Sequence, residues 1–403
     1  MSIIFRRSLL ASLVLVISAC STTSHEPDAS DSETSPAHPA QSEQSDGAAP
    51  PIDQPRTVIS SALRPASFSG LPGWSDDKHS EAWKAFLSSC SVLTRRPDWR
   101  KPCDAAKRVD GGDDAAVRHF FETSFRPYQV RNPDGSETGT VTGYYEPLLH
   151  GARKRGGAYQ TPLHRAPDDL LTIDFAAIYP ELKGKHLRGK LVGKKVVSYP
   201  ERAELMRSNE LSGKEIVWVD DAIDAFFLQV QGSGRVLLPH GEVIRVAYAD
   251  QNGQPYKSIG RYLIDKGELT MSQASMQGIK AWVAAHPSRQ EELLNVNPRY
   301  IFFREEEISD PSVGPKGAMG LPLTPERSIA VDPAYIPLGA PVFLATTQPG
   351  SKSPLQRLVM AQDTGSAIKS PVRADFFWGF GAQAGETAGR MKQRGSMWVL
   401  LPK

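Results

Sequence analysis

Hydrophobic residues recur with helical spacing in several segments of the chain. In 113–125, Val117, Phe120, Phe121 and Phe125 fall on one side of a helix whose start carries acidic residues, as the helix dipole favours. Further helices are predicted over 258–266, 272–285 and 287–295 and, broken by glycine, near 382–394.

Short β-branched and aromatic runs, each stopped by glycine or proline, predict strands. The clearest is 139–147, Gly-Thr-Val-Thr-Gly-Tyr-Tyr-Glu-Pro, and 226–231, 235–238 and 243–249 predict a meander with turns at 232–234 and 239–241. Residues 148–215 are basic and are expected to be rich in loops, and no repeat of 20 to 50 residues is present. The pattern predicts an α+β fold, mainly β, with β-barrels.

The first residues have the pattern of a secretory signal. Arg6 and Arg7 precede the apolar run Leu9–Ile17, which is too short to span a bilayer, and Ser18-Ala19-Cys20 follows. Ile17-Ser18-Ala19-Cys20 resembles a bacterial lipobox, so we expect 1–19 to be removed and Cys20 to carry lipid. The alternative is an ordinary signal peptide in which the cysteine is incidental.

Composition separates the next segment from the rest of the chain. Residues 21–55 carry seven acids, no Lys or Arg and no aromatic residue, so we expect 20–55 to be a disordered tether rich in Ser, Pro and Ala. Residues 56–403 carry 45 basic and 38 acidic side chains. This moderate excess suits an anionic polymer but lacks the dense basic patches of a nucleic-acid binder.

Two further cysteines are expected to form a disulfide, because the chain is predicted to be exported. Cys90 follows Trp83, Phe86 and Leu87 at helical spacing, whereas Cys103 follows segments around Pro97 and Pro102 that are typical of turns. A catalytic thiol is the alternative, but no histidine lies nearby in the sequence.

The usual motifs for nucleotide, metal and serine-hydrolase chemistry are absent. The sequence contains no GxxxxGK[ST], GxGxxG after a strand, HExxH or GxSxG, and its nine histidines are scattered without ligand spacing. Carboxylates remain as the candidate reactive groups, and no metal site is predicted.

Three aspartates lie in apolar, strand-like segments: Asp332, Asp363 and Asp375. Bulky apolar neighbours raise the pKa of a carboxyl and can keep it protonated as a general acid. The segment around Asp375, Val-Arg-Ala-Asp-Phe-Phe-Trp-Gly, has this setting most strongly. Turn capping is the competing interpretation for Asp363 and Asp332.

Several residues near glycine are candidate contacts for a sugar polymer. Tyr144, Tyr145 and Trp378 could stack on sugar rings, although packing in a core is the commoner use of aromatic residues. Gln231, Gly232 and Ser233 could present amide and hydroxyl groups, or form a plain hairpin turn.

Short motifs occur in a fixed order over most of 70–403. They are Thr142–Pro147, Val230–Gly234, Tyr248–Asp250, Ser258–Tyr262, Ser275–Ile279, Asn297-Pro298 with Tyr300–Phe303, Ala361–Lys369 and Asp375–Gly379. Each motif alone is weak, but in this order behind a lipobox they closely resemble the family of membrane-bound lytic murein transglycosylase A.

This resemblance implies a double-psi β-barrel domain built from both chain ends, 56–147 and 267–403. Its part 318–403 would contain the three aspartates. A smaller β-rich domain, 148–266, would be inserted in it, with a groove between the two.

The resemblance also implies cleavage of the β-1,4 bond between N-acetylmuramic acid and N-acetylglucosamine in peptidoglycan, without water and with a 1,6-anhydro ring as product. The three aspartates of the family domain map onto Asp332, Asp363 and Asp375, and the catalytic acid maps to Asp375. The chemistry of the reaction suits Asp363 to support the positive charge that develops at C1. Lys369 could contact the polymer, or it could equally be a plain surface residue. No cofactor is expected, the partners are glycan strands and the membrane, and the location is the outer membrane, facing the periplasm.

Two other functional classes stay open at this point. One is a hydrolytic muramidase or other glycanase on a similar barrel, and the other is a cell-wall-binding lipoprotein without catalytic activity. Exo or endo action, the oligomeric state and the role of Asp332 are left open as well.

Overall fold

The computed structural model describes residues 62–182, 187–308, 310–365 and 367–403. The predicted signal peptide, Cys20 and the predicted tether lie outside these residues. Within the described part, no helix has both the length and the apolar character needed to cross a membrane.

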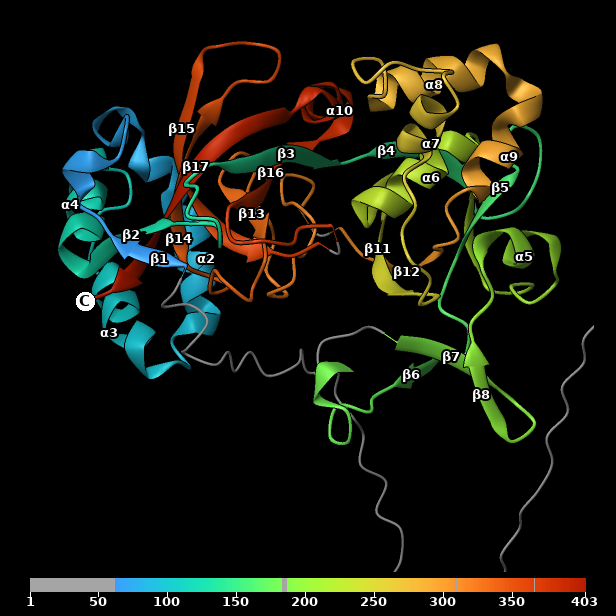
Figure 1. Ribbon diagram of the computed structural model, residues 1–403, viewed down its shortest axis with the longest axis horizontal. Coiled ribbons are helices and arrows are strands. Elements are labelled where there is room, and N and C mark those ends of the chain that lie inside the picture. Colours follow the sequence, from blue (N-terminus) through green and yellow to red (C-terminus); the bar gives the residue numbers. More distant parts are fainter. Residues whose placement is uncertain (1–61, 183–186, 309, 366) are drawn as a thin grey trace, which may run out of the picture. The chain divides into compact units, whose positions relative to one another are not determined.

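The largest sheet combines strands from both ends of the described chain (Figure 1). Its hydrogen-bonded order is β1-β2-β17-β14-β15-β13-β16-β3, and an additional β17–β3 pairing closes a ring of strands. The strands are β1 (Leu63–Pro65), β2 (Phe125–Val130), β3 (Gly139–Glu146), β13 (Ser328–Val331), β14 (Pro341–Thr347), β15 (Pro354–Asp363), β16 (Arg373–Phe380) and β17 (Lys392–Pro402).

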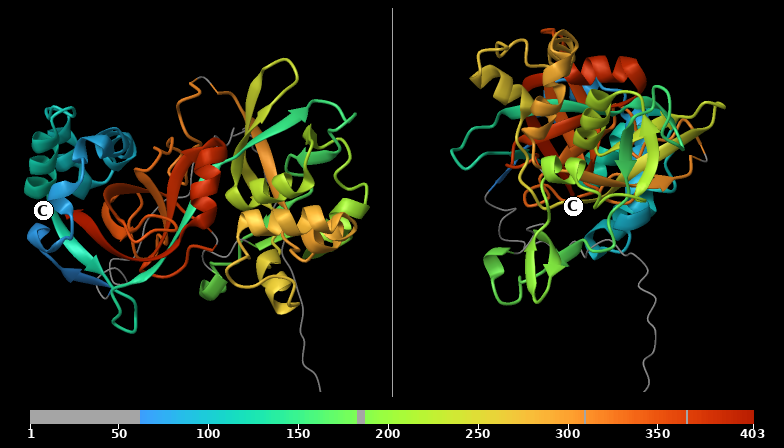
Figure 2. Two further views of the ribbon diagram at one scale, coloured as in Figure 1. Left: turned by 90° about the horizontal axis from the view of Figure 1, so that it is seen from above. Right: turned by 90° about the vertical axis from the view of Figure 1, so that its right-hand side faces the viewer.

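Helices near the N-terminal end pack on this first sheet. They are α2 (Trp83–Leu93), α3 (Pro97–Ala106) and α4 (Asp114–Ser124), and they share one hydrophobic cluster with β13 to β17. The C-terminal Lys403 lies beside α4, where its backbone N–H donates to Ser124 (Figure 2). Cys90 and Cys103 join α2 to α3 by a disulfide with a Cα–Cα distance of 5.4 Å.

The second sheet has the order β12-β11-β10-β4-β9-β5. Its strands are β4 (Leu148–Ala152), β5 (Thr161–His164), β9 (Glu215–Val219), β10 (Ser233–Leu237), β11 (Val243–Gln251) and β12 (Ile301–Glu306). The helices that follow or pack on it are α5 (Arg202–Arg207), α6 (Ala222–Gln231), α7 (Ile259–Asp265), α8 (Met276–Ala285) and α9 (Gln290–Asn295). Only Pro147 separates β3 from β4, so the chain passes directly from the first sheet to the second.

A third, small sheet has the order β6-β7-β8, with β6 (Leu171–Ile173), β7 (Leu187–Val192) and β8 (Lys195–Ser198). The described chain is therefore mixed α+β and mainly sheet, as predicted. The helix predicted over 113–125 and the strand over 139–147 are both present.

Three local predictions were wrong. Residues 226–231 belong to helix α6, not to a strand, because Asp221 caps its start and Gly232 adopts the left-handed conformation, φ +86°, at its end. The segment before Cys103 is helix α3, with Pro97 in its first turn, where proline is tolerated. The helix predicted to 394 ends at Arg390 because β17 begins at Lys392. Between its loops, the segment 148–215 contains the short strands β4 to β8.

Candidate active site

Asp375 lies on β16 between two neighbouring strands of the first sheet. Its register partners are Ala330 on β13 and Thr142 on β3. The Thr142 hydroxyl donates a 2.6 Å hydrogen bond to Oδ1 of Asp375, and Arg373 donates to the same hydroxyl oxygen at 2.8 Å. The strand ladders therefore fix both the carboxyl and its donor.

Burial is the largest influence on the Asp375 carboxyl, and it raises the pKa of Asp375 to about 6. The hydrogen bond from Thr142 and the charge of Arg373 lower this pKa, whereas the charge of Asp363 raises it. A carboxyl with this pKa retains its proton in a fraction of the molecules at neutral pH, so it can serve as a general acid.

Asp363 ends β15 and accepts three hydrogen bonds. The backbone N–H groups of Ala318 and Thr364 donate to Oδ1, each at 2.9 Å, and the Tyr144 hydroxyl donates to Oδ2 at 2.9 Å. Burial raises the pKa of Asp363, and these hydrogen bonds act in the opposite direction. Oδ1 of Asp363 thus stabilises the turn after β15, while Oδ2 accepts a hydrogen bond from Tyr144 of β3.

The charges of both acidic residues act on the pKa of Tyr144. Burial first, and then the charges of Asp363 and Asp375, raise the pKa of Tyr144 well above its usual range, so its hydroxyl stays protonated and donates. Its ring lies 5.2 Å from the ring of Phe377, measured between centroids. The structure therefore brings together Tyr144, Asp363 and Asp375, which are far apart in the sequence.

The other two predicted aromatic contacts pack within the protein. Tyr145 is 8% exposed, and its hydroxyl lies 3.6 Å from the sulfur of Met276. Trp378 is half-buried, and its Nε1 donates to the sulfur of Met391 at 3.2 Å. Contact of either ring with a sugar stays a prediction.

Residues 231–233 lie where α6 ends and β10 begins. The Gln231 Oε1 accepts the backbone N–H of Tyr145 at 3.1 Å, so this segment is tied to β3. Gly232 ends the helix with positive φ, and space for a side chain is open there. Ser233 starts β10 opposite Ala247.

The remaining predicted residues follow the strands that carry the acids. Lys369 is exposed in the segment after β15. Asp332 accepts the backbone N–H groups of Ala334 at 3.1 Å and Ser370 at 3.0 Å. Asp332 therefore holds two turns, which agrees with its interpretation as a turn-closing residue.

A buried carboxylate that the sequence did not single out lies at the end of β3. Glu146 is fully buried and accepts hydrogen bonds from Arg235 at 2.9 Å and from Arg245 at 2.6 Å. The same arginines donate to the backbone carbonyls of Pro311 and Val313, each at 2.7 Å. This cluster fastens the first sheet to β10, β11 and the 311–313 segment.

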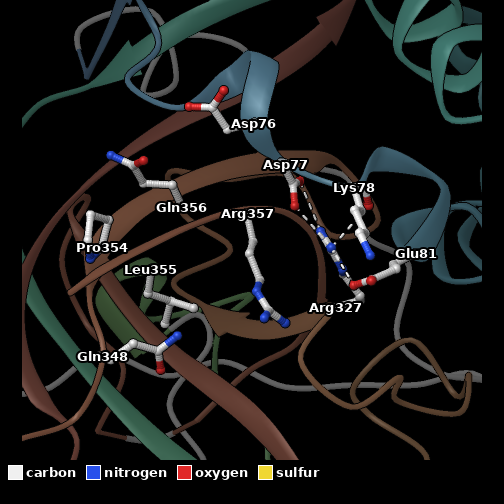
Figure 3. A pocket seen from close by; sticks show the side chains of 10 residues that line it. All are labelled: Asp76, Asp77, Lys78, Glu81, Arg327, Gln348, Pro354, Leu355, Gln356 and Arg357. Carbon is white, nitrogen blue, oxygen red and sulfur yellow. Dashed lines mark hydrogen bonds and ion pairs between the residues drawn. The ribbon is translucent and has the colours of Figure 1, made fainter. Parts of the chain in front are cut away.

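A hollow of about 370 Å³ lies elsewhere, beside β15 (Figure 3). Its lining contains none of the predicted site residues, and Arg327 within it is held by two 3.0 Å hydrogen bonds to Asp77. The lining residues are Asp76, Asp77, Lys78, Glu81, Arg327, Gln348, Pro354, Leu355, Gln356 and Arg357. Among the described residues, no group of three or more His, Cys, Asp or Glu side chains is arranged to hold a metal ion.

The fold and this site define a mixed α+β protein whose candidate reactive groups are half-buried carboxyls. Residues 140–304 match the MltA specific insert domain and residues 327–401 match the 3D domain. Membrane-bound lytic murein transglycosylase A of Escherichia coli K12 is 31% identical over 298 residues, covering 72% of each chain.

Two solved structures are also similar. Lytic transglycosylase LtgG of Burkholderia pseudomallei is 54% identical with a TM-score of 0.59, covering 85% of this chain and 96% of the other. E. coli MltA with bound chitohexaose is 26% identical with a TM-score of 0.63, covering 87% and 93%. The chain belongs to the family of membrane-bound lytic murein transglycosylase A.

Proposed function

We propose that this protein is a peptidoglycan lytic transglycosylase. It cleaves the β-1,4 bond between N-acetylmuramic acid and N-acetylglucosamine and closes a 1,6-anhydro ring on the muramic acid. Family membership supports this activity, and the relative with bound chitohexaose supports a β-1,4-linked glycan as the ligand. The observation that carries the proposal is the protonatable Asp375 beside Asp363 and Tyr144.

In the proposed mechanism Asp375 acts twice. The protonated carboxyl donates its proton to the glycosidic oxygen as the bond to C1 of the muramic acid breaks. The resulting carboxylate then accepts the proton of the C6 hydroxyl as that oxygen bonds to C1. Ordinary glycosidases use a second carboxylate on the opposite side of the bond, but here the nucleophile already belongs to the substrate, so ring closure benefits from a high effective molarity.

Asp363 has a supporting role in this proposal. As a carboxylate held by three donors it would stabilise the positive charge that develops at C1. Tyr144 would keep it oriented. We further propose that Tyr145, Gln231, Gly232, Ser233, Lys369 and Trp378 contact the glycan.

The proposal includes the architecture and the cellular location. We infer that the closed ring of the first sheet is the double-psi β-barrel and that the second sheet belongs to an inserted domain, with the glycan in a groove between them. Because β12 pairs with β11, the pairing supports extending the insertion from residue 266 to about Glu306. Lipid on Cys20 would attach the protein to the outer membrane, facing the periplasm.

Digestion of isolated sacculi tests the activity. The wild-type protein should release fragments with anhydro ends, which are one water, about 18 Da, lighter than hydrolytic fragments. Asp375→Asn removes the transferable proton but keeps the size of the side chain. It should lower the rate about 10²- to 10⁴-fold, with the melting temperature within a few degrees of wild type.

Other products of the digestion would indicate other functions. Reducing ends at full mass would indicate a hydrolase, and sacculus binding without release would indicate a binding protein. If Asp375→Asn kept more than about a tenth of the wild-type rate, Asp375 would not be the proton donor. Asp363→Asn is the comparison variant, and we expect it to lower both activity and stability because Asp363 also holds a turn.

A further inference from the structure

The small sheet β6-β7-β8 (Figure 1) has one face on which apolar side chains predominate. Leu171 pairs with Gly189, Ile173 with Leu187, and Leu191 with Val196. Because directly paired residues share a face and alternate residues of a strand share a face, these side chains lie on one side of the sheet. We call this side the apolar face; its apolar side chains are Leu171, Ile173, Leu187, Leu191 and Val196, and Ser198 opposite Gly189 is its polar member.

The apolar face is continuous and largely uncovered. Leu191 is 62% exposed, Val196 is 52% exposed and Leu171 is 37% exposed. A Cβ atom added at Gly189 would lie 3.0 Å from both Ile173 and Val196, so the neighbouring side chains close over this glycine. None of the five residues belongs to a hydrophobic cluster of the described part of the chain.

The opposite face of the small sheet carries its charged residues beside Val192 and Val197, and ion pairs attach it to the rest of the protein. Arg188 donates to Asp250 of β11 at 2.8 Å, and Lys190 donates to Glu210 at 2.7 Å. These ion pairs direct the face of Arg188 and Lys190 toward the body of the protein, so the apolar face is directed outward.

The hairpin β7-β8 is also strongly basic. Residues 187–198 contain Arg188, Lys190, Lys194 and Lys195 and no acid. Lys194 and Lys195 lie exposed where the two strands connect, and no ion pair holds either of them within the described ranges. The tip therefore presents free positive charge next to an exposed aliphatic surface.

We propose that the apolar face and the lysine tip dock on the surface of an anionic lipid bilayer. Aliphatic side chains gain free energy by entering the boundary between headgroups and acyl chains, and lysines are attracted to lipid phosphates. A glycan would favour aromatic stacking surfaces, which this face lacks. Two copies packed face to face would bring four lysines together, which disfavours self-association.

The proposal rests on the membrane location under the proposed function and is independent of the lytic chemistry. Its test uses the mature chain from residue 20 with Cys20→Ala, so that no acyl chain contributes to binding. We expect this protein to cosediment with vesicles of phosphatidylglycerol at low salt and to dissociate at high salt. It should not bind vesicles of phosphatidylcholine.

Two sets of variants separate the apolar and charged contributions. Leu191→Ser with Val196→Ser should weaken binding to phosphatidylglycerol about tenfold or more. Lys194→Ala with Lys195→Ala should weaken it about fivefold for each lysine. Met271→Ser is the matched control, because Met271 is 60% exposed and lies outside this sheet; its binding should equal that of the parent protein.

Several results would overturn the proposal. One is absence of binding to phosphatidylglycerol vesicles, and another is binding by the serine variant that equals that of the parent protein. A third is a sedimentation mass that falls from dimer to monomer in the serine variant, which would identify a second copy of the chain as the occupant of the apolar face. Sacculus digestion is measured on the same samples. Lost vesicle binding with intact digestion contradicts only the docking surface, whereas lost digestion contradicts the proposed function.

Discussion

At the scale of single residues, opposing influences on the pKa of Asp375 determine whether its carboxyl can donate a proton. Burial raises the pKa of Asp375, and Thr142 and Arg373 lower it. Burial prevails, and with a pKa of about 6 roughly a tenth of the molecules keep the proton at pH 7. Under the proposed function this fraction is the active form, so kcat/KM should fall as the pH rises above about 6.

Replacing Thr142 with valine tests this balance. Thr142→Val keeps the shape of the side chain but removes the hydroxyl that stabilises the Asp375 carboxylate. The pKa of Asp375 should therefore rise, and the descending limb of kcat/KM against pH should move upward by about one pH unit. The measurement is a pH profile of anhydro-fragment release from soluble glycan strands.

Thr140→Val is the matched control for this experiment. Thr140 lies two residues earlier on β3, next to Arg373 in the parallel register. Its substitution should leave the descending limb in place. A Thr142→Val profile that superimposes on wild type would show that another group controls the limb.

At the scale of elements, the sequence predicted best where each element buries one face. Helix α4 does so, with Val117, Phe120 and Phe121 buried on one side. Helix α6 does not, because Ala225 and Leu228 join one hydrophobic cluster while Ile223 and Phe226 join another. Burial on two sides removes the helical periodicity and leaves a continuous apolar run, which also suits a strand.

The same distinction applies to the candidate site. The apolar neighbours of Asp375 and Asp363 are adjacent in the sequence, so their setting could be predicted. The partners of Glu146 are far from it in the sequence, because Arg235 and Arg245 lie 89 and 99 residues away. A lone acid before proline gives no indication of a buried ion cluster, and the order of the strands alone brings these arginines to it.

Glu146→Gln should strongly destabilise the protein. The amide keeps the volume of the side chain but leaves the largely buried Arg235 and Arg245 without their counter-charge. Removing one partner of a buried ion pair lowers the free energy of unfolding by about 3–5 kcal/mol. Denaturant unfolding followed by far-UV circular dichroism measures the change.

The control for this variant is Glu305→Gln. Glu305 pairs with Arg153 at 2.6 Å, but both side chains are about 40% exposed, so the loss should be at most about 1 kcal/mol. Equal losses in the two variants would contradict a structural role for the buried cluster.

At the scale of the whole molecule, attachment and catalysis are assigned to different parts of the chain. The described residues contain the sheets, the candidate acids and the apolar face, but no helix that could cross a membrane. In the proposed function, permanent attachment is through lipid on Cys20. Because lipid on Cys20 tethers the folded part of the chain to the membrane, the apolar face would bind the bilayer at a high effective concentration. The two attachments together would restrict the orientations in which the folded part reaches the peptidoglycan.

This division predicts a specific defect for Cys20→Ala. Ile17-Ser18-Ala19-Cys20 resembles a lipobox, so Cys20 is the expected site of lipid attachment. Cells grown with labelled palmitate should produce an unlabelled Cys20→Ala protein. The double variant Cys90→Ala with Cys103→Ala, which removes only the disulfide, should be labelled like wild type. Label on the Cys20→Ala protein would place the acyl chain elsewhere. Loss of label from the double variant would mean that lipidation depends on the folded body, and attachment and catalysis would then no longer be separable.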